Sequence, residues 1–251
     1  MTEKPLRIVM VRHGESQWNH GKLFCGWYNC PLTKTGENEA RQAGKALKEK
    51  GIEVDAAFSS LLLRANQTCD LILEELGVKE DVEVKRSWRL NERHYGDLTG
   101  QNKVVAVAKY GADQVKLWRR SYDVAPPPIS QSNPYYTQIQ QNKVFVDVPK
   151  EEFPTSESLK MTTDRSWPAI KSGKTVLLAA HGNLLRGLIK NIDNVSEEDI
   201  INLNLPTGIP FIYEFDKDMK PTKSLEFISD EKIVKTGLEK VKDQTTKTYV
   251  R

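Results

Sequence analysis

Short apolar runs recur along the chain and predict the strands of a sheet. The run RIVMV is continuously apolar, as expected of a buried strand, whereas VEVKR alternates apolar and polar residues and indicates a more exposed one. The predicted strands are RIVMV (7–11), VDAAF (54–58), VEVKR (82–86), TVLLAA (175–180) and IPFIYEF (209–215).

Between these runs, apolar residues return at helical spacing. Ala40, Ala43 and Leu47 share one face of a predicted helix, and Gly51 would end it. The predicted helices cover roughly 36–50, 65–76, 103–110, 113–122 with Asp113 as N-cap, 181–192, a helix capped by Ser196 and a C-terminal helix opened by Asp230. Strands separated by helices predict an α/β fold, a mostly parallel central sheet with helices on both faces.

One proline-rich segment breaks this alternation. Six of the twelve prolines lie between Pro126 and Pro154, where only KVFVDV (143–148) hints at a strand. Long irregular segments inside compact domains are usually lids, binding loops or linkers. We therefore expect a lid insert over 123–158 within a single domain spanning 1–251. The polar, basic end at 240–251 is expected to be a mobile tail that helps to close the site.

Charge and cysteine content exclude several classes of protein. A formal net charge of +3 is too small to indicate a nucleic-acid-binding protein, so any positive field must come from clustered arginines. No signal peptide and no apolar stretch of membrane-spanning length is expected. The three cysteines have no metal-ligand spacing and suit a reducing cytosol, so we expect a cytoplasmic protein without a metal.

Two of the four histidines stand in the same context, an apolar strand followed by histidine, glycine and a helix. The two stretches read IVMVRHG and LLAAHGN, and they place His13 beside Arg12 and His181 before a glycine. Ligands of open α/β sheets bind beyond the carboxyl ends of strands, where helix starts offer N–H groups to an anion. Either histidine alone would more often be structural, but the duplication favours one shared anion site.

The stretch WRLNERHYGDLTG (88–100) places Glu92 between two arginines. One interpretation is a solvated loop with internal ion pairs. The other is a site, because aromatic residues are interleaved with the charges and Arg64, Arg119 and Arg120 supply further guanidinium groups. Arginine matches phosphate and carboxylate geometry. If these groups converge, the site suits a small, multiply charged anion.

These residue types fit phosphoryl transfer through a histidine. A neutral imidazole is a good nucleophile when a hydrogen bond fixes its second nitrogen. Arginines and a second, protonated histidine would stabilise the transferring group, and Glu92 could move the proton of a hydroxyl. The sequence contains no GxxxxGK[ST] nucleotide loop.

Longer motifs resemble a known family. RHG alone marks a superfamily, whereas NERHYG, WRRSYD and LPTGIP in this order are far more specific. Together with FCGW, SESLK and AAHGN, and over about residues 8–243, they resemble the cofactor-dependent phosphoglycerate mutases of the histidine phosphatase superfamily. The resemblance implies interconversion of 3-phosphoglycerate and 2-phosphoglycerate primed by 2,3-bisphosphoglycerate, with side synthase and phosphatase activities, in a homodimer.

The resemblance also implies residue roles. His13 would be the phosphorylated nucleophile, Arg12 and Arg64 would hold its phosphate, Glu92 would be the acid/base, and His181 would stabilise the transferring group. The matching substrate-binding positions are Ser16, Asn19, Cys25, Gly26, Arg93, Tyr95, Lys103, Arg119, Arg120, Gly182 and Asn183. Ser16 and Gly26 match the glycolytic mutases rather than the relatives specialised for making 2,3-bisphosphoglycerate.

Three departures from the family pattern matter, of which the replacement of a leucine by Gln101 is expected to be mild. Leu184 replaces a small polar residue, and the stretch 161–171 is about two helical turns shorter than in the family. Pro168 would end any helix that Ser158–Arg165 begins, and Trp167 is expected to fold inward over the sheet. We expect the shortening to lower stability and to leave the catalytic residues in place.

Two alternatives to a mutase stay open. One is a phosphatase whose phosphohistidine loses its phosphate to water. The other is a non-catalytic, metabolite-binding relative, against which the presence of every matched catalytic residue argues.

Overall fold

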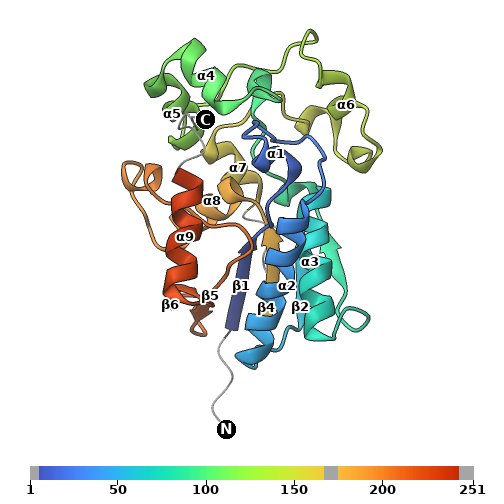
Figure 1. The fold of residues 1–251 in the computed structure, drawn as a ribbon, viewed down its shortest axis with the longest axis vertical. Coiled ribbons are helices and arrows are strands. Elements are labelled where there is room, and N and C mark those ends of the chain that lie inside the picture. Colours follow the sequence, from blue (N-terminus) through green and yellow to red (C-terminus); the bar gives the residue numbers. More distant parts are fainter. Residues whose placement is uncertain (1–5, 167–174, 243–251) are drawn as a thin grey trace, which may run out of the picture.

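The computed structural model describes residues 6–166 and 175–242, and a six-stranded sheet lies at its centre (Figure 1). The strand order is β3-β2-β4-β1-β5-β6, in which the first four strands run parallel. β5 is antiparallel to β1, and β6 is antiparallel to β5. The strands are β1 (Leu6–Arg12), β2 (Ala56–Ser59), β3 (Val84–Arg86), β4 (Thr175–Ala180), β5 (Pro210–Phe215) and β6 (Pro221–Phe227). The predicted α/β class is confirmed.

Alternating side chains of the central strands fill two cores. In β1, Val9 and Val11 pack with helices α2 and α3, whereas Ile8 and Met10 pack with α8 on the opposite face. This is the two-residue period of a strand, so an uninterrupted apolar run is what a strand buried on both faces requires. The helices are α1 (Gln17–His20), α2 (Lys34–Glu49), α3 (Leu63–Leu76), α4 (Lys103–Tyr110), α5 (Ala112–Arg120), α6 (Tyr136–Gln140), α7 (Leu159–Ser166), α8 (Gly182–Ile192) and α9 (Glu231–Lys242).

Several predicted elements differ in the structure. Ser196 does not begin a full helix, because only a short 3-10 turn follows at Asp199–Ile201. KVFVDV forms a 3-10 turn at Lys143–Phe145 instead of a strand. α5 begins at Ala112, and its N-cap is Gly111, two residues before the predicted N-cap Asp113. β6 was missed because its side chains are largely exposed and carry no apolar pattern.

The proline-rich segment 123–158 packs around a small core that it shares with residues outside the segment. Ile139, Phe145 and Val148 of this segment cluster with Trp27 and Leu62. Figure 1 shows α4, α5 and α6 beyond the same end of the sheet, the end at which β1 reaches its carboxyl terminus. The lid expectation concerns motion and stays a prediction.

Parts of two expectations lie outside the described residues. Trp167 and Pro168 are among them, as is 243–251 of the expected tail. α7 is described over Leu159–Ser166, close to the predicted 158–165. It packs so tightly on α8 that a Cβ added at Gly187 would lie 2.0 Å from the hydroxyl oxygen of Thr163. Within 6–166 and 175–242, no helix has both the length and the apolar character needed to cross a membrane.

Candidate active site

The two candidate histidines meet because their strands are neighbours. β1 pairs with β4 so that Arg12 lies beside Ala180, and the N–H of His13 extends the ladder to the carbonyl of Ala180 at 2.9 Å. His181 directly follows the last residue of β4, and the two imidazole centroids are 5.1 Å apart. The carboxyl ends of parallel strands thus bring both histidines to one place, as the sequence pattern predicted.

Glycine after His13 lets the turn approach α2 closely. A Cβ at Gly14 would lie 2.2 Å from the carbonyl oxygen of Gly36, which is shorter than any real contact. Gly36 has the reciprocal constraint, because its added Cβ would lie 2.1 Å from the carbonyl oxygen of Glu15. The chain can therefore leave β1 only with small residues at both positions.

His13 is arranged as a neutral nucleophile. Its Nδ1 lies 2.7 Å from the carbonyl oxygen of Gly14, so this nitrogen carries the proton and donates it. Its Nε2 accepts a hydrogen bond from Nε of Arg64 at 3.2 Å. Burial lowers the pKa of His13 well below its ordinary value, and the charges of Arg64 and Arg12 lower it further. The lone pair of Nε2 is therefore available to an electrophile.

Carbonyl groups hold the two arginines beside His13. Arg64 donates to the carbonyls of Tyr28 at 3.0 Å and of Gly26 at 2.8 Å, in addition to His13. Nη1 of Arg12 donates to the carbonyl of Leu205 at 2.8 Å, while its buried Nε has no hydrogen-bond partner. Both guanidinium groups are thus fixed before a ligand arrives, which reduces the ordering cost of binding an anion.

His181 lies behind the cavity wall. It is fully buried, and its Nε2 is 2.8 Å from the hydroxyl oxygen of Ser60, while Nδ1 has no partner. Burial lowers the pKa of His181 well below its ordinary value, and Arg64 and His13 add to this effect. The protein without ligand therefore favours a neutral imidazole here, in contrast to the protonated second histidine that the sequence suggested.

Glu92 lies in the loop between β3 and α4, and Arg165 of α7 holds this loop. Glu92 is 8% exposed, and its Oε1 accepts the N–H of Arg93 at 2.8 Å. Arg165 donates to the carbonyls of Asn91 at 3.0 Å and Glu92 at 3.1 Å. It also pairs with Glu157 through an Nε–Oε1 contact of 2.6 Å. Sequence reasoning missed Arg165, because its role depends on a contact between segments distant in the chain.

A second group of cations lies across the cavity from His13. Arg119 and Arg120 end α5, Lys103 begins α4, and Arg186 comes from α8. Burial, followed by the charge of Arg119, lowers the pKa of Lys103 and of Arg120, the latter to about 10. This is the expected response of like charges that are crowded together in a poorly hydrated space.

An amide and a phenol link these cations. Nη1 of Arg186 donates to Oδ1 of Asn183 at 3.0 Å, and Nδ2 of Asn183 donates to the Tyr95 hydroxyl at 3.0 Å. Arg186 was not predicted, although its place three residues after Asn183 puts both on one face of α8. That spacing could have identified Arg186 as a site residue from the sequence.

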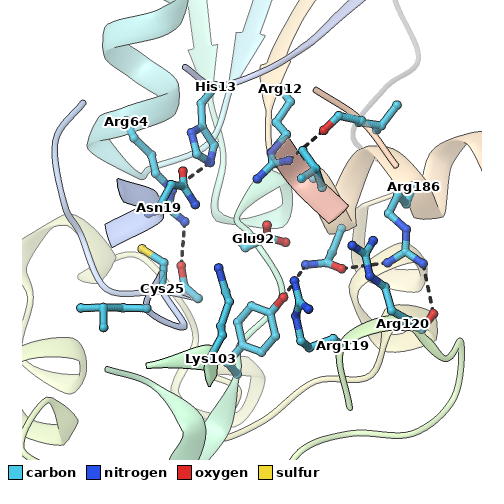
Figure 2. A pocket seen from close by; sticks show the side chains of 17 residues that line it. Arg12, His13, Asn19, Cys25, Arg64, Glu92, Lys103, Arg119, Arg120 and Arg186 are labelled. Carbon is cyan, nitrogen blue, oxygen red and sulfur yellow. Dashed lines mark hydrogen bonds between the residues drawn. The ribbon is translucent and has the colours of Figure 1, made fainter. Parts of the chain in front are cut away.

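Most of these residues line one cavity of about 630 Å³, counting its open mouth. Figure 2 shows Glu92 near its middle, with His13 and Arg64 on one side and Arg119, Arg120 and Arg186 on the other. Of the described residues that line it, one is a carboxylate, Glu92, and six are cations: Arg12, Arg64, Lys103, Arg119, Arg120 and Arg186. A formal surplus of five positive charges favours a multiply charged anion.

All predicted site residues line this cavity except Ser16, Arg93 and His181, which lie directly behind its wall. The Ser16 hydroxyl donates to Oδ1 of Asn19, and Arg93 donates to the carbonyl of Arg119. Besides Arg186, the sequence did not predict three apolar lining residues, Leu23, Leu205 and Val241. Their residue types carry no chemical signal.

Comparison with known proteins agrees with this geometry. The family model of the histidine phosphatase superfamily (branch 1) matches residues 8–226. The structure of mycobacterial hydrolase 1 matches with a TM-score of 0.66 at 21% identity, over 88% of this chain and 97% of that chain. A mycobacterial glucosyl-3-phosphoglycerate phosphatase matches with a TM-score of 0.64 at 22% identity, over 88% and 96% of the two chains.

The α-ribazole phosphatase of Shigella flexneri matches with a TM-score of 0.62 at 18% identity, over 89% of this chain and 98% of that chain. At such identities the three structures show a shared fold. The family match is broader evidence, because it spans both strand–histidine–glycine turns and most of the chain. The chain belongs to the histidine phosphatase superfamily.

Proposed function

We propose that this protein is a phosphoglycerate mutase that interconverts 3-phosphoglycerate and 2-phosphoglycerate through a phosphohistidine on His13. Membership of the superfamily indicates an enzyme of phosphatase or phosphotransferase type. The observation that supports the mutase is the distribution of charge, with cations at both ends of one cavity and Glu92 between them.

A mutase of this kind must bind an anion at each end of its substrate. The phosphoryl group lies against Nε2 of His13, where Arg12 and Arg64 stabilise its charge. The carboxylate, or the second phosphate of 2,3-bisphosphoglycerate, lies against Arg119 and its neighbours. Because both ends are cationic, the bisphosphate can bind in either direction, and reversal of its orientation is the step that moves the phosphate.

The same geometry indicates which groups hold and transfer the protons. His13 attacks as a neutral imidazole, and Nδ1 keeps its proton on the carbonyl of Gly14. Glu92 takes the proton from the hydroxyl that receives the phosphoryl group. It returns a proton to the substrate oxygen that gives up its phosphoryl group. His181, whose ring centroid is 5.1 Å from that of His13, would hold a phosphoryl oxygen once the incoming dianion favours its protonation. Only 2,3-bisphosphoglycerate is needed as primer, and no metal ion takes part.

A phosphatase is the second candidate. Two of the matched structures are named as phosphatases, and their fold is shared here. The same phosphohistidine would then react with water, and the second cationic group would serve substrate binding alone.

One pair of assays separates the two. Purified protein is given 3-phosphoglycerate with and without a trace of 2,3-bisphosphoglycerate, and formation of 2-phosphoglycerate is followed through enolase. Free phosphate is measured in parallel. The mutase predicts fast, primer-dependent conversion with little phosphate release. Stoichiometric phosphate release without 2-phosphoglycerate would establish the phosphatase instead, and His13→Ala should abolish either activity.

A further inference from the structure

Two cysteines lie side by side, Cys25 in the wall of the cavity and Cys30 buried next to it. Cys25 lines the cavity, and its Sγ is 3.3 Å from Sγ of Cys30. The loop that carries them is folded by its own backbone, because the N–H of Tyr28 donates to the carbonyl of Cys25 and the N–H of Cys30 donates to the carbonyl of Tyr28. The two sulfur atoms are therefore held close together before any reaction.

The surroundings favour one thiolate shared by the pair. The hydrogen bond from Cys25, followed by the charge of Arg64, lowers the pKa of Cys30. Burial and the bond to Cys30 raise the pKa of Cys25. A thiolate with a neighbouring thiol is the arrangement that reacts with peroxides and then closes to a disulfide.

We propose that Cys25 and Cys30 form a reversible modification site, which hydroperoxides oxidise to an intramolecular disulfide in the wall of the cavity. The thiolate attacks one peroxide oxygen, which forms a sulfenic acid and releases hydroxide. The second thiol attacks the sulfenic sulfur, the S–S bond forms, and its proton leaves with the sulfenic hydroxyl as water. One dithiol and one hydrogen peroxide thus give one disulfide and, after protonation of the hydroxide, two waters. External thiols reverse the step by exchange.

The disulfide would disturb the nucleophile through Arg64. The sulfur atoms must close to a bond of about 2 Å, which moves Cys25 and the adjacent Gly26. The carbonyl of Gly26 accepts from Arg64, and Arg64 in turn donates to Nε2 of His13. Because a misplacement of about 1 Å can cost ~10²-fold in rate, we expect oxidation to lower turnover at least ~10-fold.

Peptide mapping tests the bond itself, independently of the proposed function. The full chain is treated with hydrogen peroxide, the remaining thiols are alkylated, and a tryptic digest is analysed without reduction. The peptide 23–34 carries both cysteines and should lose two hydrogens and take no alkyl group. Dithiothreitol should restore both alkylation sites. Cys69, which is buried in the sheet core and whose pKa burial raises to about 12, should stay a free thiol.

Variants test the consequence for activity, which rests on the proposed function. Cys30→Ala should keep normal turnover under reducing conditions and should resist peroxide, whereas Cys69→Ala should lose turnover as the wild type does. If 3-phosphoglycerate is not a substrate, hydrolysis of p-nitrophenyl phosphate replaces the mutase assay. Recovery of Cys25 as a sulfinic acid with Cys30 still alkylated would overturn the proposal. So would equal inactivation of Cys30→Ala and wild type by peroxide.

Discussion

At the scale of single residues, Glu92 is the group whose role is easiest to separate from binding. Glu92→Gln keeps size and polarity but removes the base. We expect kcat to fall ~10²-fold or more with a smaller change in KM, because proton transfer is lost while the cations of the cavity remain. Steady-state kinetics of 3-phosphoglycerate conversion measure this. An unchanged kcat would reduce Glu92 to an ion-pair partner of the neighbouring arginines.

Arg186 should act on substrate affinity. Arg186→Met removes one cation from the end of the cavity opposite His13. We expect KM to rise ~10- to 100-fold, because this is the effect on affinity of losing one hydrogen bond to a charged group. Lys190→Ala is the matched control, because Lys190 lies on the same helix and does not line the cavity. If both variants shift KM equally, general charge rather than a specific contact explains the effect.

At the scale of elements, α7 positions the loop that carries Glu92. The Arg165 and Glu157 side chains are 9% and 3% exposed, so removing one partner leaves the other as a buried, unpaired charge. Arg165→Ala should cost about 3–5 kcal/mol of unfolding free energy, measured by urea denaturation. Lys160→Ala should change it little, because its pair with Asp164 on the same helix is exposed.

A double variant separates stability from positioning. Arg165→Met with Glu157→Gln removes both charges, so most of the lost stability should return. Turnover should stay low, because the carbonyls of Asn91 and Glu92 are no longer held. Recovery of full turnover together with stability would contradict the positioning role.

The sequence predicted the elements whose pattern is strong. α2 and α3 have clear apolar faces and glycines after their ends, and β1 and β4 have continuous apolar runs, so all four were placed within a few residues. α1 and α6 were missed, because helices of four and five residues are too short to show a period. The expectation that ligands bind beyond the carboxyl ends of strands placed His13 and His181 in one site. By contrast, no sequence pattern around Arg165 indicated its contact with the loop of Glu92.

At the scale of the whole molecule, buried histidines should make stability depend on pH. Burial lowers the pKa of His94 to about 4 and also lowers those of His13 and His181. Between the lowered pKa of each histidine and about pH 6.5, the unfolded chain binds protons that the folded chain does not. The free energy of unfolding therefore falls as the pH falls through this range. Each histidine contributes up to about 1.4 kcal/mol per pH unit.

Urea denaturation of wild type and His94→Gln between about pH 7 and 5 measures this dependence. The variant should show a shallower slope than wild type. A wild-type slope in His94→Gln would mean that this histidine is already protonated in the folded protein.

The most direct test of the whole account is whether His13 accepts a phosphoryl group. Protein is incubated with phosphate-labelled 2,3-bisphosphoglycerate, and the label is mapped by peptide and tested for its stability in acid and base. We predict acid-labile, base-stable label on the peptide that contains His13, and none on His13→Ala. Equal labelling of wild type and His13→Ala would contradict the phosphohistidine and, with it, the proposed mechanism.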